Sequence, residues 1–170
     1  MLRVLNKLRK IGIITETLPD TEQKVLEAIG VQVKAGIGRR FQGSLAIRAV
    51  DAGSCNGCEL EIHALNNAFY NLERFGIHFV ASPRHADMLL VTGPVSRHMQ
   101  TALLRTYMAT PEPKLVIAVG ECGANGGEFG VSYASCGAVS NVIPVDAVIR
   151  GCPPAPLDLL RGILEVINAP

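Results

Sequence analysis

Residues 45–58 read Leu45-Ala-Ile-Arg-Ala-Val-Asp-Ala-Gly-Ser-Cys-Asn-Gly-Cys58, an apolar run that leads into a glycine-containing turn with two cysteines. This pattern predicts a buried strand over residues 45–50, with both cysteines just beyond its carboxyl end. Similar apolar runs at residues 77–81, 88–92, 115–119 and 142–145 predict four more strands. Helical patterns at residues 59–75, 97–109 and 157–167 alternate with them. The alternation predicts an α/β fold with a mainly parallel sheet.

The first forty or so residues lack this strand pattern. Near the amino terminus, basic and apolar residues have the spacing of a short amphipathic helix: Arg3, Lys7, Arg9 and Lys10 stand among Leu2, Val4, Leu5, Leu8 and Ile11. Such a helix packs on its own domain or forms an arm against a partner or a membrane surface, and we favour the partner. Three glycines predict a loop into the main domain: Gly36, Gly38 and Gly43. We therefore expect an amino-terminal arm and loop over residues 1–43, followed by a three-layer, flavodoxin-like α/β domain over residues 44–170.

Composition limits the classes of protein and of partner. The 170 residues are enough for one domain with a substantial core. Hydrophobic residues make up 48% of the chain and charged residues only 18%, so part of the surface is expected to meet other proteins. The formal net charge of +1 gives no basic footprint for a nucleic-acid partner. Neither a signal peptide nor a membrane-spanning run is evident, which predicts a cytoplasmic protein with reduced thiols.

Four of the five cysteines follow predicted strands. Cys55 and Cys58 come after the strand at residues 45–50, Cys122 after the strand at 115–119, and Cys152 after the strand at 142–145. In an open parallel sheet, the loops at the carboxyl ends of the strands converge on one crevice. We therefore expect these four thiols to meet at one edge of the sheet. Cys136 lies outside this pattern and is expected to be a small buried apolar residue.

Four thiolates around one site can hold a 4Fe-4S cluster or a structural zinc ion. Glycine or proline lies within two residues of each cysteine, which favours tight turns that direct backbone amides at cluster sulfurs. Zinc sites commonly use two paired-cysteine knuckles, whereas this chain combines one pair with two isolated cysteines. The pattern favours the cluster and leaves zinc open. A redox-active pair at Cys55 and Cys58 is less favoured, because such a pair does not require Cys122 and Cys152 at the same edge.

Other polar residues near the cysteine pair have less specific patterns. Glu59, Glu61 and His63 follow the pair on the predicted helix. They can relay protons or bind a partner subunit, but solvation or helix capping is the expected role of at least two of them. No Ser-His-Asp arrangement or phosphate-binding glycine loop is apparent, so hydrolase and nucleotide-binding functions have no motif in their favour.

Five motifs in register resemble one protein family. They are Cys55-Asn-Gly-Cys58-Glu-Leu-Glu-Ile62, Ser82-Pro-Arg-His-Ala-Asp87, Gly120-Glu-Cys122, Ile143-Pro-Val-Asp146 and Gly151-Cys-Pro-Pro154. In this order they resemble the small subunit of membrane-associated nickel-iron hydrogenases of the energy-converting and formate hydrogenlyase type. The cluster-bearing subunit of respiratory complex I belongs to the same family. The resemblance spans residues 45–164, nearly the whole predicted α/β domain.

The resemblance implies a function and a setting. Cys55, Cys58, Cys122 and Cys152 would hold one 4Fe-4S cluster, the proximal cluster next to the nickel-iron centre of a separate large subunit. Residues 44–170 would then form the iron–sulfur domain of an oxidoreductase subunit that transfers electrons and has no catalytic residue of its own. The implied partners are that large subunit, a ferredoxin-like iron–sulfur subunit and membrane-embedded subunits. The implied location is cytoplasmic, peripheral on the inner face of the cell membrane.

The spacing of the cysteine pair separates the branches of the family. The complex I subunit typically has two adjacent cysteines, so Cys55-Asn-Gly-Cys58 points to the hydrogenase branch. The alternatives within the family are a quinone-reducing subunit of the complex I type and a hydrogenase-related complex without nickel. Outside the family, the alternative is a zinc-stabilised interaction domain. Arg150 stands where relatives commonly have proline, a departure that touches none of the four cysteines.

Overall fold

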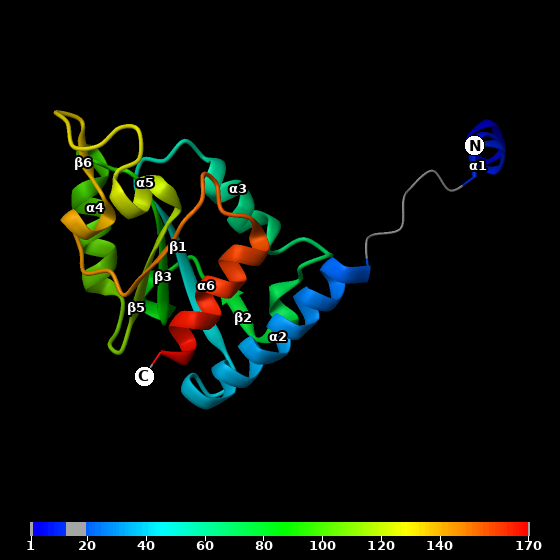
Figure 1. The fold of residues 1–170 in the computed structure, drawn as a ribbon, viewed down its shortest axis with the longest axis horizontal. Helices are drawn as coiled ribbons and strands as arrows, with labels where there is room; N and C mark the ends of the chain where they lie inside the picture. The colour runs from blue at the N-terminus through cyan, green and yellow to red at the C-terminus, as the bar shows by residue number, and fades with distance from the viewer. Residues whose placement is uncertain (1, 13–19, 170) are drawn as a thin grey trace.

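The computed structural model describes residues 2–12 and 20–169, and at its centre is a five-stranded parallel sheet (Figure 1). The strands are β1 (Leu45–Asp51), β2 (Ile77–Phe79), β3 (Met88–Thr92), β5 (Leu115–Val119) and β7 (Ala147–Ile149). Their order across the sheet, β2-β1-β3-β5-β7, is that of a flavodoxin-like doubly wound fold, whose switch point lies between β1 and β3. The predicted fold class is therefore confirmed.

Helices cover both faces of the sheet and make it the middle of three layers. α2 (Asp20–Arg40) and α6 (Pro156–Asn168) pack against each other on one face, and α4 (Arg97–Ala109) covers the other (Figure 1). Alternate residues of β3 serve the two layers: Met88 and Leu90 are buried with α2 and α6, whereas Leu89 and Val91 are buried with α4. This burial on two sides explains why β3 and β5 are almost continuously apolar.

Shorter elements complete the fold. α3 (Gly57–Ala64) and α5 (Gly120–Asn125) follow β1 and β5 at the carboxyl end of the sheet. Three 3-10 turns are η1 (Leu72–Phe75), η2 (Pro83–His85) and η3 (Val139–Asn141), and β4 (Val95–Ser96) pairs antiparallel with β6 (Ser135–Gly137). At the amino terminus, α1 (Leu2–Ile11) confirms the predicted helix and stands apart from the sheet in Figure 1.

Two predicted elements have the wrong bounds, one because of an Asn side chain and the other because of a proline. The helix expected over residues 59–75 ends at Ala64, since the Asn67 side-chain oxygen accepts hydrogen bonds from the amides of Phe69 and Tyr70 at 2.8 and 2.9 Å. Such an Asx turn competes with continued helix. The strand expected over residues 142–145 lies instead at Ala147–Ile149. Pro144 has no amide proton to donate to a neighbouring strand, so the chain joins the sheet only beyond this proline.

The loop predicted from the three glycines is also wrong for two of them. Gly36 and Gly38 lie inside α2, while Gly43 lies in the turn that follows the helix. A Cβ at Gly36 would lie 2.7 Å from Cγ2 of Ile167 in α6. The glycine therefore serves the close approach of two helices rather than a turn, which sequence spacing alone does not distinguish.

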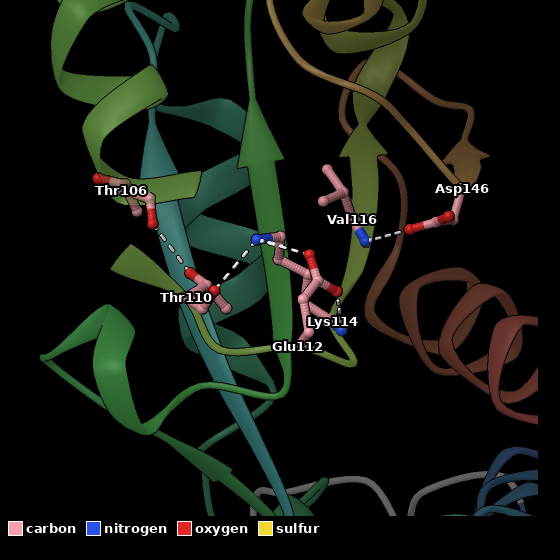
Figure 2. A network of polar contacts seen from close by, with 6 residues as sticks. All are labelled: Thr106, Thr110, Glu112, Lys114, Val116 and Asp146. Carbon is pink, nitrogen blue, oxygen red and sulfur yellow. Dashed lines mark hydrogen bonds and ion pairs between the residues drawn. The ribbon is translucent and has the colours of Figure 1, made fainter. Parts of the chain in front are cut away.

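Two aspartates secure the register of the sheet at the amino-terminal ends of its strands. Asp146, just before β7, accepts a hydrogen bond on Oδ2 from the amide of Val116 at 2.7 Å, and its own amide donates to the Val116 carbonyl at 2.9 Å (Figure 2). Asp87, just before β3, makes the same two bonds with Ala46 of β1, at 2.9 and 2.8 Å. These aspartates end two of the five motifs, so the structure assigns those motifs a role in strand pairing.

Lys114 is a nearly buried cation in the turn that precedes β5. Its side chain is only 8% exposed, and its ammonium group lies 3.0 Å from a carboxylate oxygen of Glu112. The ammonium also donates to the carbonyl of Thr110 at 3.1 Å (Figure 2). It lies 4.2 Å from the ring centre of Tyr107. The hydrogen bond from Lys114, together with its charge, lowers the pKa of the Glu112 carboxyl group.

Candidate functional site

The four cysteines of the predicted site lie at the carboxyl ends of the parallel strands. Cys55 is in the loop between β1 and α3, Cys58 in α3, Cys122 in α5 and Cys152 in the loop after β7. Figure 1 shows α3 and α5 at one end of the sheet, with the orange loop after β7 between them. A Cβ at Gly57 would lie 3.6 Å from Sγ of Cys55 and 3.9 Å from Pro153, the residue after Cys152. A Cβ at Gly120 would lie 2.6 Å from Sγ of Cys58, and Cys122 and Cys152 line one cavity of about 400 Å³, so the segments that carry the four cysteines are neighbours. The sheet thus brings together thiols that follow three different strands.

Two glycines bring the backbone against the sulfurs. The backbone at Gly120 has φ +79°, and a Cβ there would lie 2.6 Å from Sγ of Cys58. At Gly127, with φ +54°, a Cβ would lie 2.6 Å from Sγ of Cys122. A side chain at either position would displace a sulfur, and L-residues adopt these φ values only at a cost. The glycines therefore keep the space beside two of the thiols open.

A main-chain hydrogen bond connects α5, which carries Cys122, to the loop that carries Cys152. The amide of Glu121 donates to the carbonyl of Gly151 at 3.0 Å. An ion pair lies beside it, with Nη1 of Arg150 3.2 Å from a carboxylate oxygen of Glu121. The side chain of Arg150 is 71% exposed, so solvent weakens this pair and the main-chain bond sets the spacing of the loops.

Burial and neighbouring charge hold two of the thiols in the protonated state at neutral pH. Cys58 is buried and Cys122 half-buried, whereas Cys55 and Cys152 are exposed. Burial, followed by the charges of Glu59 and the other three cysteines, raises the pKa of Cys58 to about 11. Burial and the charges of Cys152 and Cys55 also raise the pKa of Cys122. A metal group that binds thiolates must displace protons from these side chains.

The four cysteines do not form a compact set of metal ligands in the described part of the chain. Within residues 2–12 and 20–169, no three His, Cys, Asp or Glu side chains are grouped closely enough to hold one metal ion. A tetrahedral zinc ion draws its sulfur ligands to about 2.3 Å from a common centre. A 4Fe-4S cluster also takes four thiolates, one on each of its iron atoms. Cys136 is buried with Leu103 and Val139 under α4, as expected of an apolar residue.

Glu59 has an environment that its sequence position does not reveal. One carboxylate oxygen accepts a hydrogen bond from the hydroxyl of Thr92, which is 1% exposed. The other oxygen is buried and has no hydrogen-bond partner among the described residues. Both side chains line a cavity of about 460 Å³ at the ends of β1 and β3, together with Arg48 and His63. Sequence reasoning missed Thr92 entirely, because only its place at the end of β3 marks it.

Large apolar side chains are exposed in the segments that carry the thiols. Leu60, two residues after Cys58, is 61% exposed. Phe129, Val131 and Tyr133, in the segment after α5, are 62%, 70% and 98% exposed. Exposed apolar side chains in such numbers are typical of a surface that another protein covers. This agrees with the low share of charged residues in the sequence.

The fold and the site together define a class: a doubly wound α/β protein with four cysteines at the carboxyl end of its sheet. Proteins of this class bind their ligands at that end of the sheet. Comparison with known protein families identifies the family. The chain belongs to the family described as NADH ubiquinone oxidoreductase, 20 Kd subunit, whose sequence profile matches residues 55–166. That segment begins at the first cysteine of the site and contains the other three. The resemblance predicted from the five motifs is therefore confirmed at the level of the family.

Individual relatives are subunits of oxidoreductase complexes. The chain is 45% identical over 136 residues to formate hydrogenlyase subunit 7 of Escherichia coli, a match that covers 80% of this chain and 53% of that protein. It is 43% identical over 149 residues to the probable membrane-bound hydrogenase subunit mbhJ of Pyrococcus furiosus, covering 88% of this chain and 87% of the relative. This chain thus spans about half the length of the first relative and most of the second.

A solved structure has the same fold. In the membrane-bound sulfane sulfur reductase, an archaeal respiratory membrane complex, one chain matches with a TM-score of 0.64 and 34% identity. The match covers 84% of this chain and 73% of that one. The mbhJ subunit and the sulfane sulfur reductase chain belong to complexes named as membrane-bound. In the part of this chain that the structure describes, none of the helices has both the length and the apolar character needed to cross a bilayer.

Proposed function

We propose that this chain is the electron-transfer small subunit of a membrane-associated nickel-iron hydrogenase of the energy-converting type. In this proposal Cys55, Cys58, Cys122 and Cys152 hold one 4Fe-4S cluster, proximal to a large subunit where protons are reduced or hydrogen is oxidised. One observation carries the proposal: cysteines that follow three separate strands lie in neighbouring segments at the ligand-binding edge of the sheet, inside the part of the chain that matches the family.

The residues of the site have distinct tasks in this function. When bound, a 4Fe-4S cluster supplies one-electron transfer at a potential that its surroundings set. Cys58, at 8% exposed, occupies the buried side of the site and keeps water away from it. Cys55 and Cys152 lie on the exposed side, where a partner subunit would approach. Gly120 and Gly127 have no side chain, so the backbone can lie close to the sulfurs of Cys58 and Cys122. The close backbone and the burial of the site are means by which a protein sets the reduction potential of a metal group.

The partners follow from the exposed surface and from the names of the relatives. The large subunit would cover the apolar side chains around the thiols, including Leu60, Phe129 and Tyr133. A ferredoxin-like iron–sulfur subunit would pass electrons to or from this chain, and membrane-embedded subunits would hold the assembly at the inner face of the cell membrane. The named membrane-bound complexes of mbhJ and of the sulfane sulfur reductase support this setting.

Different observations favour different branches of the family. Formate hydrogenlyase subunit 7 and mbhJ are named for hydrogen chemistry, and with the Cys55–Cys58 spacing they support the hydrogenase. The sulfane sulfur reductase supports a second candidate, a hydrogenase-related complex without nickel and with another reaction. The family description supports a quinone-reducing subunit of the complex I type. Nickel bound to the partner large subunit separates the first candidate from the other two.

The test is metal analysis of the complex, purified anaerobically through this subunit. Iron, acid-labile sulfide, nickel and zinc are measured, and electron paramagnetic resonance spectra are recorded after dithionite reduction. We expect Cys122→Ala to lose about four irons and one reducible signal per complex. Cys136→Ala, a buried cysteine outside the site, should lose neither. Stoichiometric zinc with no missing signal in Cys122→Ala would overturn the cluster and leave the zinc-stabilised domain.

A further inference from the structure

α1 carries a concentrated positive charge. Its ten residues, LRVLNKLRKI, include four basic residues and no acidic one. Arg3, Lys7 and Lys10 are spaced i, i+4 and i+7, so they share one side of the helix, and all three are exposed. Since the whole chain has a formal charge of +1 and α1 has +4, the remaining residues together have −3. The positive charge of this protein is therefore a property of α1 and not of its body.

The same helix exposes apolar side chains. Leu5 is 58% exposed and Ile11 is 50% exposed. In the sequence, the other apolar residues of α1 occupy helix positions 2, 4 and 8, and positions 4, 8 and 11 share one side by the i, i+4, i+7 rule. By this spacing, Arg3, Lys7 and Lys10 fall on another side of the helix than residues 4, 8 and 11, whereas Arg9 falls next to Leu5, and the helix has no acidic residue. This is the pattern of a helix that lies in the interface of a bilayer.

We infer that α1 is a lipid-binding helix that lies on an anionic membrane surface, with its apolar side among the acyl chains and its basic side at the phosphates. Charge complementarity selects this partner: each Lys or Arg near an anionic surface strengthens binding roughly fivefold, whereas the negatively charged body is repelled. A helix of ten residues is about 15 Å long, so it lies along the surface and does not cross it. Contact with lipid is then direct, in addition to any contact with membrane-embedded subunits. The inference does not rest on the cluster.

The experiment measures binding of the full chain to lipid vesicles by co-sedimentation. One set of vesicles is phosphatidylcholine alone, and the other contains roughly one third phosphatidylglycerol, enough for a negative surface potential. Lys7→Gln combined with Lys10→Gln removes two charges of the basic side, and Leu5→Gln removes an exposed apolar contact. Matched controls come from α2, where Lys34→Gln and Val31→Gln change exposed residues of the same types. Circular dichroism establishes that each variant retains the fold.

Binding should require the anionic lipid, weaken at high ionic strength, and fall roughly 25-fold in the double lysine variant. Leu5→Gln should also weaken binding, and the α2 controls should bind like the unaltered chain. Equal binding to neutral vesicles, no binding at all, or equal losses in the α2 controls would overturn the inference. So would a result in which the α1 variants bind vesicles normally but fail to assemble with partner subunits, because the helix would then dock on protein. Iron content of the same variants separates this outcome from a failure of the proposed cluster.

Discussion

Replacing Gly120 by alanine would test the site at its tightest point. The new Cβ would lie 2.6 Å from Sγ of Cys58, whereas ordinary van der Waals contact begins at 3.4 Å. The sulfur or the backbone must then move by roughly 0.8 Å, more than the tolerance of about 0.5 Å within which a binding constellation has to be held. Alanine must also adopt φ +79°, which costs an L-residue roughly 1–2 kcal/mol. We expect Gly120→Ala to lower the free energy of unfolding by about that amount and to lose most of its bound iron.

The assay combines iron and sulfide content, electron paramagnetic resonance after reduction, and thermal unfolding. Gly38→Ala is the matched control, because Gly38 lies inside α2 and a Cβ there would meet nothing within 4 Å. This control should keep all its iron and gain about 0.5–1 kcal/mol of stability. A Gly120→Ala protein with full iron content and an unchanged spectrum would refute the argument that the backbone at residue 120 confines the sulfur of Cys58.

Two further predictions concern the amino-terminal ends of the strands. Asp146→Ala removes the acceptor of the buried Val116 amide, so the free energy of unfolding, measured in denaturant, should fall by about 1–2 kcal/mol. As a control, Glu165→Ala changes an exposed residue and should alter this free energy by no more than about 0.5 kcal/mol. Equal effects of the two substitutions would contradict the role of Asp146 in strand register. Because Lys114 lowers the pKa of Glu112, this pair stabilises the fold at neutral pH, and the contribution is lost as the pH falls through the folded-state pKa. In Lys114→Met, titration followed by nuclear magnetic resonance should show the Glu112 pKa rising toward its ordinary value, and an unchanged titration would refute the pairing.

Elements with one clear local pattern lie where the sequence predicts them. β3 and β5 coincide with the predicted strands because they are apolar runs buried on both faces. α4 has the predicted bounds, and the hydroxyl of Ser96 caps it by accepting a hydrogen bond from the amide of Met99 at 3.2 Å. The apolar run at residues 142–145 is different, since Ile143 is buried in the core under α4 without belonging to a strand. Hydrophobicity alone does not separate a buried turn from a buried strand.

The candidate site divides in a similar way. The position of the cysteines after predicted strands was enough to predict that their segments lie together at one end of the sheet, because the carboxyl ends of parallel strands converge. The contacts that surround the site were not predictable from the sequence. The backbone at Gly120 confines the position of the sulfur of Cys58, and the hydroxyl of Thr92 donates a hydrogen bond to Glu59. In each pair the two residues come from distant segments that only the folded sheet brings together. That these four cysteines are the ligands of a cluster stays a prediction for the metal analysis to test.

By itself, the sequence determined the α/β class, the family, the basic and apolar pattern of α1, and the choice of thiols as the chemical groups of the site. These properties depend on residue type and on spacing along a few turns or one strand, which a linear pattern records. Only the tertiary structure decided how deeply each thiol lies, which carboxylate oxygen is left without a partner, and that Asp87 and Asp146 hold neighbouring strands in register. Those properties depend on distances between residues far apart in the chain, and such distances exist only once the strands have paired and the helices have packed on them.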